Sequence, residues 1–213
     1  MNTRLQLKVC GMRDPENIQG LAALNPDYIG FIFYEPSPRN VGDSLNEKVV
    51  HHLPKGIKKI GVFVNENQEL ILQKVEQYHL QGIQLHGKES PEQCGQLKAK
   101  GLFVWKVFPV GETFDFEQLK PYEKVVDAFL FDTKGPQKGG NGVTFNWNIL
   151  KQYTLDIPII LSGGIGIEEI EQLEQLAHLP ILAIDVNSRM EIKPGLKDLT
   201  LVERLISRMM NDE

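Results

Sequence analysis

The chain has 213 residues, of which 41% are hydrophobic and 24% are charged, and its formal net charge is −5. This length fits one α/β domain, and this apolar fraction is ordinary for a protein with a buried core. The acidic balance without basic runs excludes the electrostatic footprint of a nucleic-acid-binding protein. The apolar runs are only as long as strands, well short of the roughly 20 residues that a membrane-spanning helix requires.

The spacing of the cysteines and the sequence of the N-terminus indicate in which cellular compartment the protein is expected. Cys10 and Cys94 lie far apart in the chain, and this spacing does not suggest a disulfide framework. The first residues lead directly into a strand pattern, without the apolar core of a signal peptide. We therefore expect a cytoplasmic protein with reduced thiols.

The first half of the chain predicts four strand–helix units. Asp14-Pro15 has the pattern of an N-cap followed by a proline at the first helical position, and Ser90-Pro91 repeats it. Asn67 is expected to cap a helix that runs to Tyr78, in which apolar residues recur at helical spacing. The predicted strands are 5–10, 28–33, 59–64 and 82–85, and the second predicted helix is 45–53.

The second half continues the alternation with weaker helical patterns. The predicted strands are 103–108, 128–132, 158–161 and 181–185, and the predicted helices are 113–122, 147–153, 168–176 and 196–210. Residues 134–144 are rich in glycine and have no hydrophobic periodicity, which predicts a mobile loop.

The repeated unit predicts the fold. Alternating strands and helices are typical of a parallel sheet, and eight units in one chain favour a closed (β/α)8 TIM barrel. A doubly wound open sheet is the alternative, although it more often has fewer strands. Composition shows no break, so we expect one domain over residues 1–213. In such barrels the carboxyl ends of the strands form the active site.

Three predicted strand ends carry groups able to transfer protons, namely Cys10, Asp132 and Asp185. A thiol can act as a base and a carboxyl group as an acid when their surroundings shift their pKa values toward the working pH. Cys10 is equally compatible with a small core residue, and Asp132 with a turn or cap. A carboxylate directly after 129–131 is nevertheless costly without a partner or a function. Cys94, inside a helix, fits core packing.

The turns after the last two strands suggest an anion site. Ser162-Gly163-Gly164 follows the seventh strand, and Asn187-Ser188-Arg189 follows the eighth. Loops at these two places in TIM barrels often bind phosphate through backbone N–H groups. A Gly-Gly pair alone is also a common turn, so its position in the chain carries the argument. We expect a small phosphorylated substrate.

Other polar residues near the strand ends have two interpretations each. Arg39 follows a proline and either pairs with a substrate carboxylate or lies in solvent. Gln84 and His86 either contact substrate or line the rim. Lys8 and Lys106 leave Schiff-base chemistry open. Lys8 is also two residues before Cys10, hence on the same strand face, where it is expected to lower the pKa of the thiol. No metal-ligand spacing or nucleotide-binding glycine motif is found, so we expect neither metal nor cofactor.

Short motifs at successive strand ends, in a fixed order, narrow these possibilities. They are Lys8-Val9-Cys10-Gly11, Pro36-Ser37-Pro38-Arg39, Gly61-Val62-Phe63-Val64-Asn65, Gln84-Leu85-His86-Gly87, Phe131-Asp132-Thr133, Gly139-Gly140, Thr144-Phe145, Ser162-Gly163-Gly164, Asp185-Val186-Asn187-Ser188 and Pro194-Gly195-Leu196-Lys197-Asp198. Together they resemble the phosphoribosylanthranilate isomerase family of tryptophan biosynthesis over nearly the whole chain.

The resemblance implies a cofactor-free Amadori rearrangement of N-(5-phosphoribosyl)anthranilate to 1-(2-carboxyphenylamino)-1-deoxyribulose 5-phosphate. It implies that Asp132 is the general acid that protonates the furanose ring oxygen and that Cys10 is the general base that removes the C2 proton. It implies that Arg39 binds the anthranilate carboxylate. It implies that Gly163-Gly164 and Ser188-Arg189 hold the phosphate. The substrate-binding set implied by the resemblance and by position at the strand ends also includes Gln84, His86 and Asp185.

The sequence departs from the family pattern in two loops. After the sixth strand, Asn141 and Val143 stand where threonine and lysine are usual, in the loop that the resemblance makes a lid. After the eighth strand, Arg189 stands where glycine is usual. Its guanidinium either adds a phosphate contact or points to solvent.

Three other functions are known for barrels or sites of this kind. The related isomerase of histidine biosynthesis uses a carboxylate where this chain has Cys10, and it needs two phosphate loops. Indole-glycerol-phosphate synthase needs a lysine acid and an N-terminal extension. A barrel that binds phosphate without catalysis would not need both Cys10 and Asp132. The sequence leaves a monomer and a homodimer open, without nucleic-acid or membrane partners.

Overall fold

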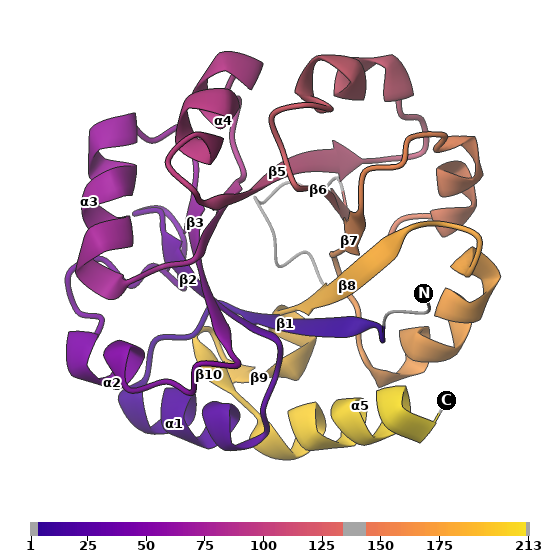
Figure 1. Ribbon diagram of the computed structural model, residues 1–213. Helices are drawn as coiled ribbons and strands as arrows, with labels where there is room; N and C mark the ends of the chain where they lie inside the picture. The colour runs from indigo at the N-terminus through magenta and orange to yellow at the C-terminus, as the bar shows by residue number, and fades with distance from the viewer. Residues whose placement is uncertain (1–3, 134–143, 212–213) are drawn as a thin grey trace.

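The computed structural model describes residues 4–133 and 144–211 and shows a closed barrel of eight parallel strands with helices around it (Figure 1). The strands pair in chain order, and β8 closes the barrel by pairing with β1. The predicted TIM barrel is thus confirmed, and the open sheet is excluded. The barrel strands are β1 (Gln6–Cys10), β2 (Tyr28–Phe33), β3 (Lys58–Phe63), β4 (Gly82–Leu85), β5 (Phe103–Val110), β6 (Ala128–Thr133), β7 (Ile159–Leu161) and β8 (Ile181–Val186).

Helices follow the strands on the outside of the barrel. The predicted N-caps Asp14, Asn67 and Ser90 each accept a hydrogen bond from the backbone N–H three residues later. The α-helices are α1 (Pro15–Ala23), α2 (Glu47–His51), α3 (Gln68–Tyr78), α4 (Pro91–Lys98) and α5 (Leu199–Asn211). The 3-10 helices are η1 (Phe116–Tyr122), η2 (Trp147–Gln152), η3 (Ile167–Leu176) and η4 (Ser188–Met190).

The second half differs from the prediction in the type and bounds of its helices. Three segments expected as helices are 3-10 helices, because apolar spacing does not distinguish i→i+3 from i→i+4 hydrogen bonding. The closing helix begins at Leu199 rather than at residue 196, because β10 (Leu196–Lys197) pairs antiparallel with β9 (Glu191–Lys193). Gly195, with a φ of +84°, lies in the turn of this hairpin. The predicted mobile loop falls on residues outside the described ranges, apart from Thr144.

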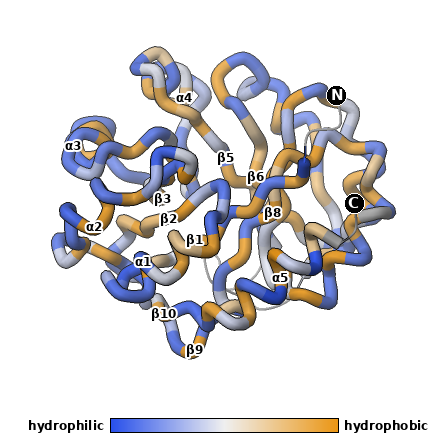
Figure 2. Tube along the Cα trace, turned by 60° about the horizontal axis from the view of Figure 1, so that its bottom comes forward, coloured by the Kyte–Doolittle hydropathy of each residue, from blue (hydrophilic) through white to orange (hydrophobic). Residues whose placement is uncertain are grey.

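Two apolar layers hold the barrel together. In Figure 2 the central strands are largely hydrophobic, whereas α5 alternates between hydrophilic and hydrophobic residues. One buried cluster includes Tyr28, Trp105 and Leu130, which alternate along their strands with residues of the second cluster. The second, larger cluster packs the strands against the surrounding helices. No helix in the described ranges is long and apolar enough to cross a membrane.

Candidate active site at the carboxyl end of the barrel

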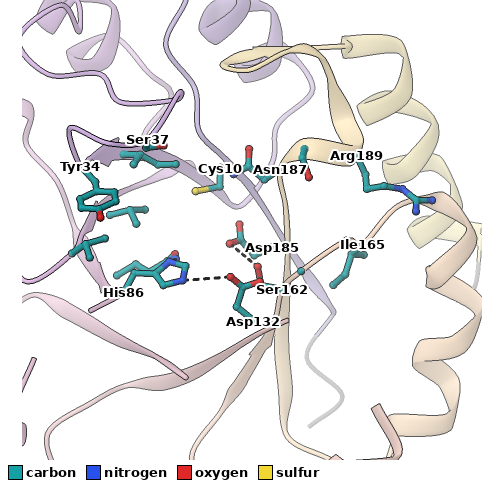
Figure 3. Close-up of a pocket in the computed structure, with 17 residues that line it drawn as sticks. Cys10, Tyr34, Ser37, His86, Asp132, Ser162, Ile165, Asp185, Asn187 and Arg189 are labelled. Carbon is teal, nitrogen blue, oxygen red and sulfur yellow. Dashed lines mark hydrogen bonds and ion pairs between the residues drawn. The ribbon is translucent and has the colours of Figure 1, made fainter. Parts of the chain in front are cut away.

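One cavity lies at the carboxyl ends of the barrel strands (Figure 3). All the predicted site residues line it except Arg39. Its wall also includes Tyr34 and Ile165, which sequence reasoning missed because an aromatic or aliphatic residue after a strand gives no chemical signal. The lining residues are Cys10, Ile32, Tyr34, Ser37, Val62, Val64, Gln84, His86, Asp132, Ser162, Gly163, Gly164, Ile165, Asp185, Asn187, Ser188 and Arg189.

The Cys10 thiol ends β1 and lies on the cavity wall (Figure 3). Gly30 on the neighbouring strand makes room for it: a Cβ there would lie 2.7 Å from Cys10 Sγ and 3.2 Å from Lys8 Cε. Cys10 is therefore held in a close-fitting place beside the backbone of β2. Cys94, by contrast, is buried in α4, and burial raises its pKa to about 11.

A buried ion pair involves Lys8, which is two residues before Cys10 on the same strand. Lys8 Nζ is 2.9 Å from Asp185 Oδ1, and the two residues are register partners across β1 and β8. Ser162 Oγ lies 3.4 Å from Asp185 Oδ2 (Figure 3). Burial lowers the pKa of Lys8, but Asp185 and Cys10 together raise it by more, so that the net shift is upward. A fixed positive charge therefore lies beside Cys10.

The net shift of the Cys10 pKa is upward, whereas the sequence led us to expect a lowered pKa. Burial raises the pKa of Cys10; Lys8 lowers it, Asp185 raises it and Lys197 lowers it, and the net result is a raised pKa. Lys8 therefore acts in the predicted sense, but strand alternation alone revealed neither the depth of burial nor the nearby carboxylate.

Asp132, at the end of β6, is buried and faces the same cavity. Its Oδ2 is 3.4 Å from His86 Nε2 (Figure 3). Its Oδ1 accepts a hydrogen bond of 2.9 Å from Thr133 N. Gln84 Nε2 lies 3.4 Å from His86 Nδ1. Gln84 Oε1 is buried and has no hydrogen-bond partner among the described residues. The cavity thus combines an acid held by histidine with an acceptor that a substrate N–H or O–H can fill.

A second buried pair supports the turn that carries His86. Glu89 accepts hydrogen bonds from Gly87 N, at 2.9 Å, and Asn65 N, at 2.8 Å. Lys106 Nζ is 3.2 Å from Glu89 Oε2 and donates to Gly87 O at 2.9 Å. Neither Lys8 nor Lys106 lines the cavity, so the structure does not support a Schiff-base lysine. No sequence pattern indicated Glu89.

Replacing Lys106 by methionine is expected to lower the free energy of unfolding by about 3–5 kcal/mol, because Glu89 would stay buried without its cation. Chemical denaturation measures this. The matched control is Lys98→Met, whose partner Asp127 is half-exposed, and a loss of about 1 kcal/mol is expected there. Equal losses in the two variants would contradict the supporting role of the buried pair.

The turn after β7 is shaped by glycine. Gly163 has a φ of +88°, and a Cβ there would lie 2.3 Å from Thr133 Oγ1 and 2.6 Å from Thr133 N. Only glycine therefore lets this turn lie against the end of β6. Gly164 also has a positive φ, and Gly166 N donates to Glu169 Oε2 at 2.8 Å.

Arg189 lies across this turn and lines the cavity (Figure 3). Its Nη2 is 2.7 Å from Glu168 Oε2 and 3.6 Å from Glu169 Oε2, at the start of η3. The guanidinium therefore has carboxylate partners beside the turn that was predicted to bind phosphate.

Arg39 lies beside the cavity rather than on its wall. Its Nε and Nη2 bind the Glu191 carboxylate, with Nη2 2.7 Å from Oε2. Glu191 belongs to the β9–β10 hairpin, which the sequence did not predict, so this partner was missed.

The fold and the site define a class: a TIM-barrel enzyme that places a thiol, a carboxyl group and a glycine turn suited to anions around one cavity. Residues 7–208 match the family model described as N-(5'phosphoribosyl)anthranilate (PRA) isomerase. The chain belongs to this isomerase family.

Curated relatives agree with this assignment over nearly their full length. The chain is 45% identical to N-(5'-phosphoribosyl)anthranilate isomerase of Phocaeicola vulgatus, over 95% of this chain and 97% of that relative. It is 43% identical to the protein of the same name from Parabacteroides distasonis, over 96% and 93% of the two chains.

Solved structures show the same architecture. Phosphoribosyl anthranilate isomerase from Thermus thermophilus superposes with a TM-score of 0.85 at 28% identity, over 98% of this chain and 100% of that one. A phosphoribosyl anthranilate isomerase in complex with reduced 1-(o-carboxyphenylamino)-1-deoxyribulose 5-phosphate superposes with a TM-score of 0.82 at 28% identity, over 97% and 99% of the two chains.

Proposed function

We propose that this isomerase converts N-(5'-phosphoribosyl)anthranilate to 1-(2-carboxyphenylamino)-1-deoxyribulose 5-phosphate in tryptophan biosynthesis, by general acid–base catalysis. The observation that carries the proposal is that the Cys10 thiol and the Asp132 carboxyl group face one cavity. The family match and the relatives support the same reaction.

Asp132 acts first, as the general acid. It gives a proton to the furanose ring oxygen while the bond from that oxygen to C1 breaks, and the nitrogen lone pair forms the protonated Schiff base. His86, 3.4 Å from Asp132 Oδ2, holds the carboxyl group toward the cavity. A positioned proton donor of this kind contributes about 10²–10⁴-fold to a rate.

Cys10 acts second, as the general base. Its thiolate takes the proton from C2, and the electron pair of the C–H bond forms the C1–C2 double bond of an enol while the iminium nitrogen is neutralised. The enol hydroxyl then loses its proton, C1 gains one, and the ketone results. Lys8 and Lys197 favour the thiolate electrostatically.

The phosphate group of the substrate is bound by the turns after β7 and β8. Gly163 and Gly164 present backbone N–H groups, Ser188 adds a hydroxyl, and Arg189 adds a cation. In this arrangement the phosphate replaces Glu168 as the partner of the guanidinium. Gln84, His86 and Asp185 contact the sugar between the two ends of the substrate.

Replacing Arg189 by glycine, the residue usual in the family, is expected to raise KM about tenfold or more with little change in kcat, since a charge-assisted hydrogen bond contributes about 1.5–3 kcal/mol. Steady-state kinetics measures this. The control is Glu168→Gln, which removes the ion pair but keeps the guanidinium; its KM should be unchanged. An unchanged KM in Arg189→Gly would exclude a direct phosphate contact.

A fluorescence assay tests the function itself, because the rearrangement removes the anthranilate fluorescence of the substrate. Purified protein should turn over N-(5'-phosphoribosyl)anthranilate, and failure to do so would overturn the proposal. A histidine-pathway substrate with two phosphates tests the alternative isomerase, and we expect no turnover of it.

We further propose that the enzyme is cytoplasmic and that it is a monomer or a homodimer. A related structure is described as monomers generated from the dimeric phosphoribosylanthranilate isomerase of Thermotoga maritima, with a TM-score of 0.81 at 30% identity. Sedimentation of the purified chain distinguishes the two states.

A further inference from the structure

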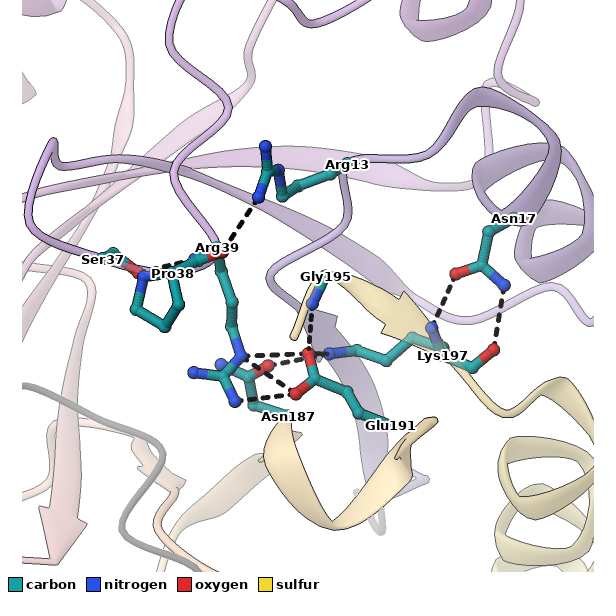
Figure 4. Close-up of polar contacts among 9 residues, drawn as sticks. All are labelled: Arg13, Asn17, Ser37, Pro38, Arg39, Asn187, Glu191, Gly195 and Lys197. Carbon is teal, nitrogen blue, oxygen red and sulfur yellow. Dashed lines mark hydrogen bonds and ion pairs between the residues drawn. The ribbon is translucent and has the colours of Figure 1, made fainter. Parts of the chain in front are cut away.

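A buried polar cluster joins the loop after β2 to the β9–β10 hairpin (Figure 4). Glu191 lies at its centre. It accepts hydrogen bonds from Arg39 Nε at 2.9 Å and Arg39 Nη2 at 2.7 Å, from Lys197 Nζ at 2.7 Å, and from Gly195 N at 3.0 Å. Asn187 Oδ1 also accepts from Lys197 Nζ, at 2.7 Å. The mechanism above gives Glu191 no role.

The Glu191 carboxylate forms hydrogen bonds with only one edge of the Arg39 guanidinium. Glu191 binds the edge formed by Nε and Nη2, and no described residue accepts a hydrogen bond from Nη1. In Figure 4 the opposite edge is turned away from the hairpin. A planar guanidinium fixed along one edge presents its remaining N–H groups in a defined direction, which suits a second carboxylate.

The stem of Arg39 lies beside the catalytic cavity. A Cβ at Gly11, the residue after Cys10, would lie 2.8 Å from Arg39 Cδ and 2.8 Å from Asn187 Oδ1. The arginine therefore passes directly over the end of β1 and beside Asn187, which lines the cavity.

The cluster also holds one more positive than negative charge. Arg39 and Lys197 are two cations around the single carboxylate of Glu191, and all three side chains are at least nine-tenths buried. Burial lowers the pKa of Lys197 to about 8, against the opposing effects of Glu191 and Cys10, so that it is still mostly protonated at pH 7. A buried surplus charge is costly unless an anion offsets it.

The hairpin that carries Glu191 is itself fixed. Asn17 of α1 donates to Lys197 O at 2.9 Å and accepts from Lys197 N at 2.8 Å. On the other side, Arg13 Nη1 donates to Pro38 O at 2.9 Å, next to Arg39 (Figure 4). Both ends of the Arg39–Glu191 contact are therefore anchored to the segment that follows Cys10.

We propose that Glu191 is a positioning residue that determines specificity for an aromatic amine bearing a carboxylate. It holds Arg39 by one edge so that the other edge meets that carboxylate, whose negative charge offsets the surplus of the cluster. This rests on the proposed function, with Arg39 binding the anthranilate carboxylate as the family resemblance implies.

The test compares two substrates, the phosphoribosyl derivatives of anthranilate and of aniline, which differ only in the carboxylate. Product is quantified by chromatography. The wild-type enzyme should prefer the carboxylated substrate in kcat/KM. Glu191→Gln should reduce this preference about tenfold or more, while kcat/KM for the aniline derivative stays within about twofold of wild type. The matched control Glu171→Gln, at an exposed carboxylate paired with Arg208, should match wild type with both substrates.

The other outcomes overturn the proposal in distinguishable ways. If Glu191→Gln increased the preference for the carboxylated substrate, Glu191 would act only as a negative charge that repels the substrate carboxylate. If kcat/KM fell equally with both substrates, the role of Glu191 would be structural. Arg39→Lys tests the underlying assignment: an unchanged preference there would show that Arg39 does not bind the carboxylate. Loss of preference in Arg39→Lys but not in Glu191→Gln would reject the positioning role of Glu191 and keep Arg39 as the residue that binds the carboxylate. If Glu191 acts through Arg39, the double variant should lose no more preference than Arg39→Lys.

Discussion

Replacing Cys10 by alanine is expected to lower kcat by about 10²–10⁴-fold, the usual contribution of a positioned general base, while the fold is retained. The alanine removes only the Sγ atom that lies against Gly30, and it cannot take the C2 proton. Steady-state fluorescence kinetics measures the loss, and thermal unfolding checks the fold. Cys94→Ala is the matched control, because Cys94 is buried in α4 and does not line the cavity; its kcat should stay within about twofold of wild type.

The pH profile separates a base from a merely structural thiol. A base works only when deprotonated, and the pKa of Cys10 is raised, first by burial. The wild-type kcat/KM should therefore still be rising with pH above neutrality. The charges around the thiol come from Lys8 on its own strand, Asp185 on β8 and Lys197 on β10, and burial lowers the pKa of Lys197 itself to about 8. Near-wild-type activity in Cys10→Ala would remove the thiol from the mechanism.

Replacing Asp132 by asparagine is expected to lower kcat by a similar factor of about 10²–10⁴. Asparagine has nearly the same shape and still accepts the hydrogen bond from Thr133 N, but it has no carboxyl proton for the ring oxygen. Asp132→Ala should lower kcat by at least as much, because alanine has no carboxyl proton either. The same kinetic assay measures both variants.

The control for this carboxyl group lies on the opposite end of the same strand. Asp127 precedes β6, accepts from Val104 N at 2.8 Å and pairs with Lys98. Asp127→Asn should cost stability while kcat stays within about twofold of wild type. If Asp132→Asn retained most of its activity, another group would have to protonate the ring oxygen.

Local sequence patterns predicted the barrel well because each strand and cap depends on neighbouring residues. Apolar runs gave the strands within one or two residues, and Asp14, Asn67 and Ser90 were recognisable caps since each bonds a backbone N–H three positions later. The parallel sheet then followed from the alternation of strands with helices, and the closed barrel followed from the eight units. Cys10 and Asp132 were identifiable because chemically reactive groups directly followed apolar strands.

Contacts between distant residues were not predictable in the same way. Arg39 and Glu191 are 152 residues apart, and the β9–β10 hairpin that brings them together is too short for a strand pattern. Glu89 was missed for the same reason, since its role depends on Lys106 from the next strand. The pKa of Cys10 depends on burial, which no single segment reveals.

The ion pair between Lys8 and Asp185 also links catalysis to the completion of folding. These residues are 177 positions apart and meet only where β8 pairs with β1, the pairing that closes the ring of strands. The long loop between them makes this pairing entropically unfavourable. A chain emerging from the ribosome therefore carries the thiol and Lys8 early, but gains the charges of Asp185 and Lys197 only when β8 and β10 are in place.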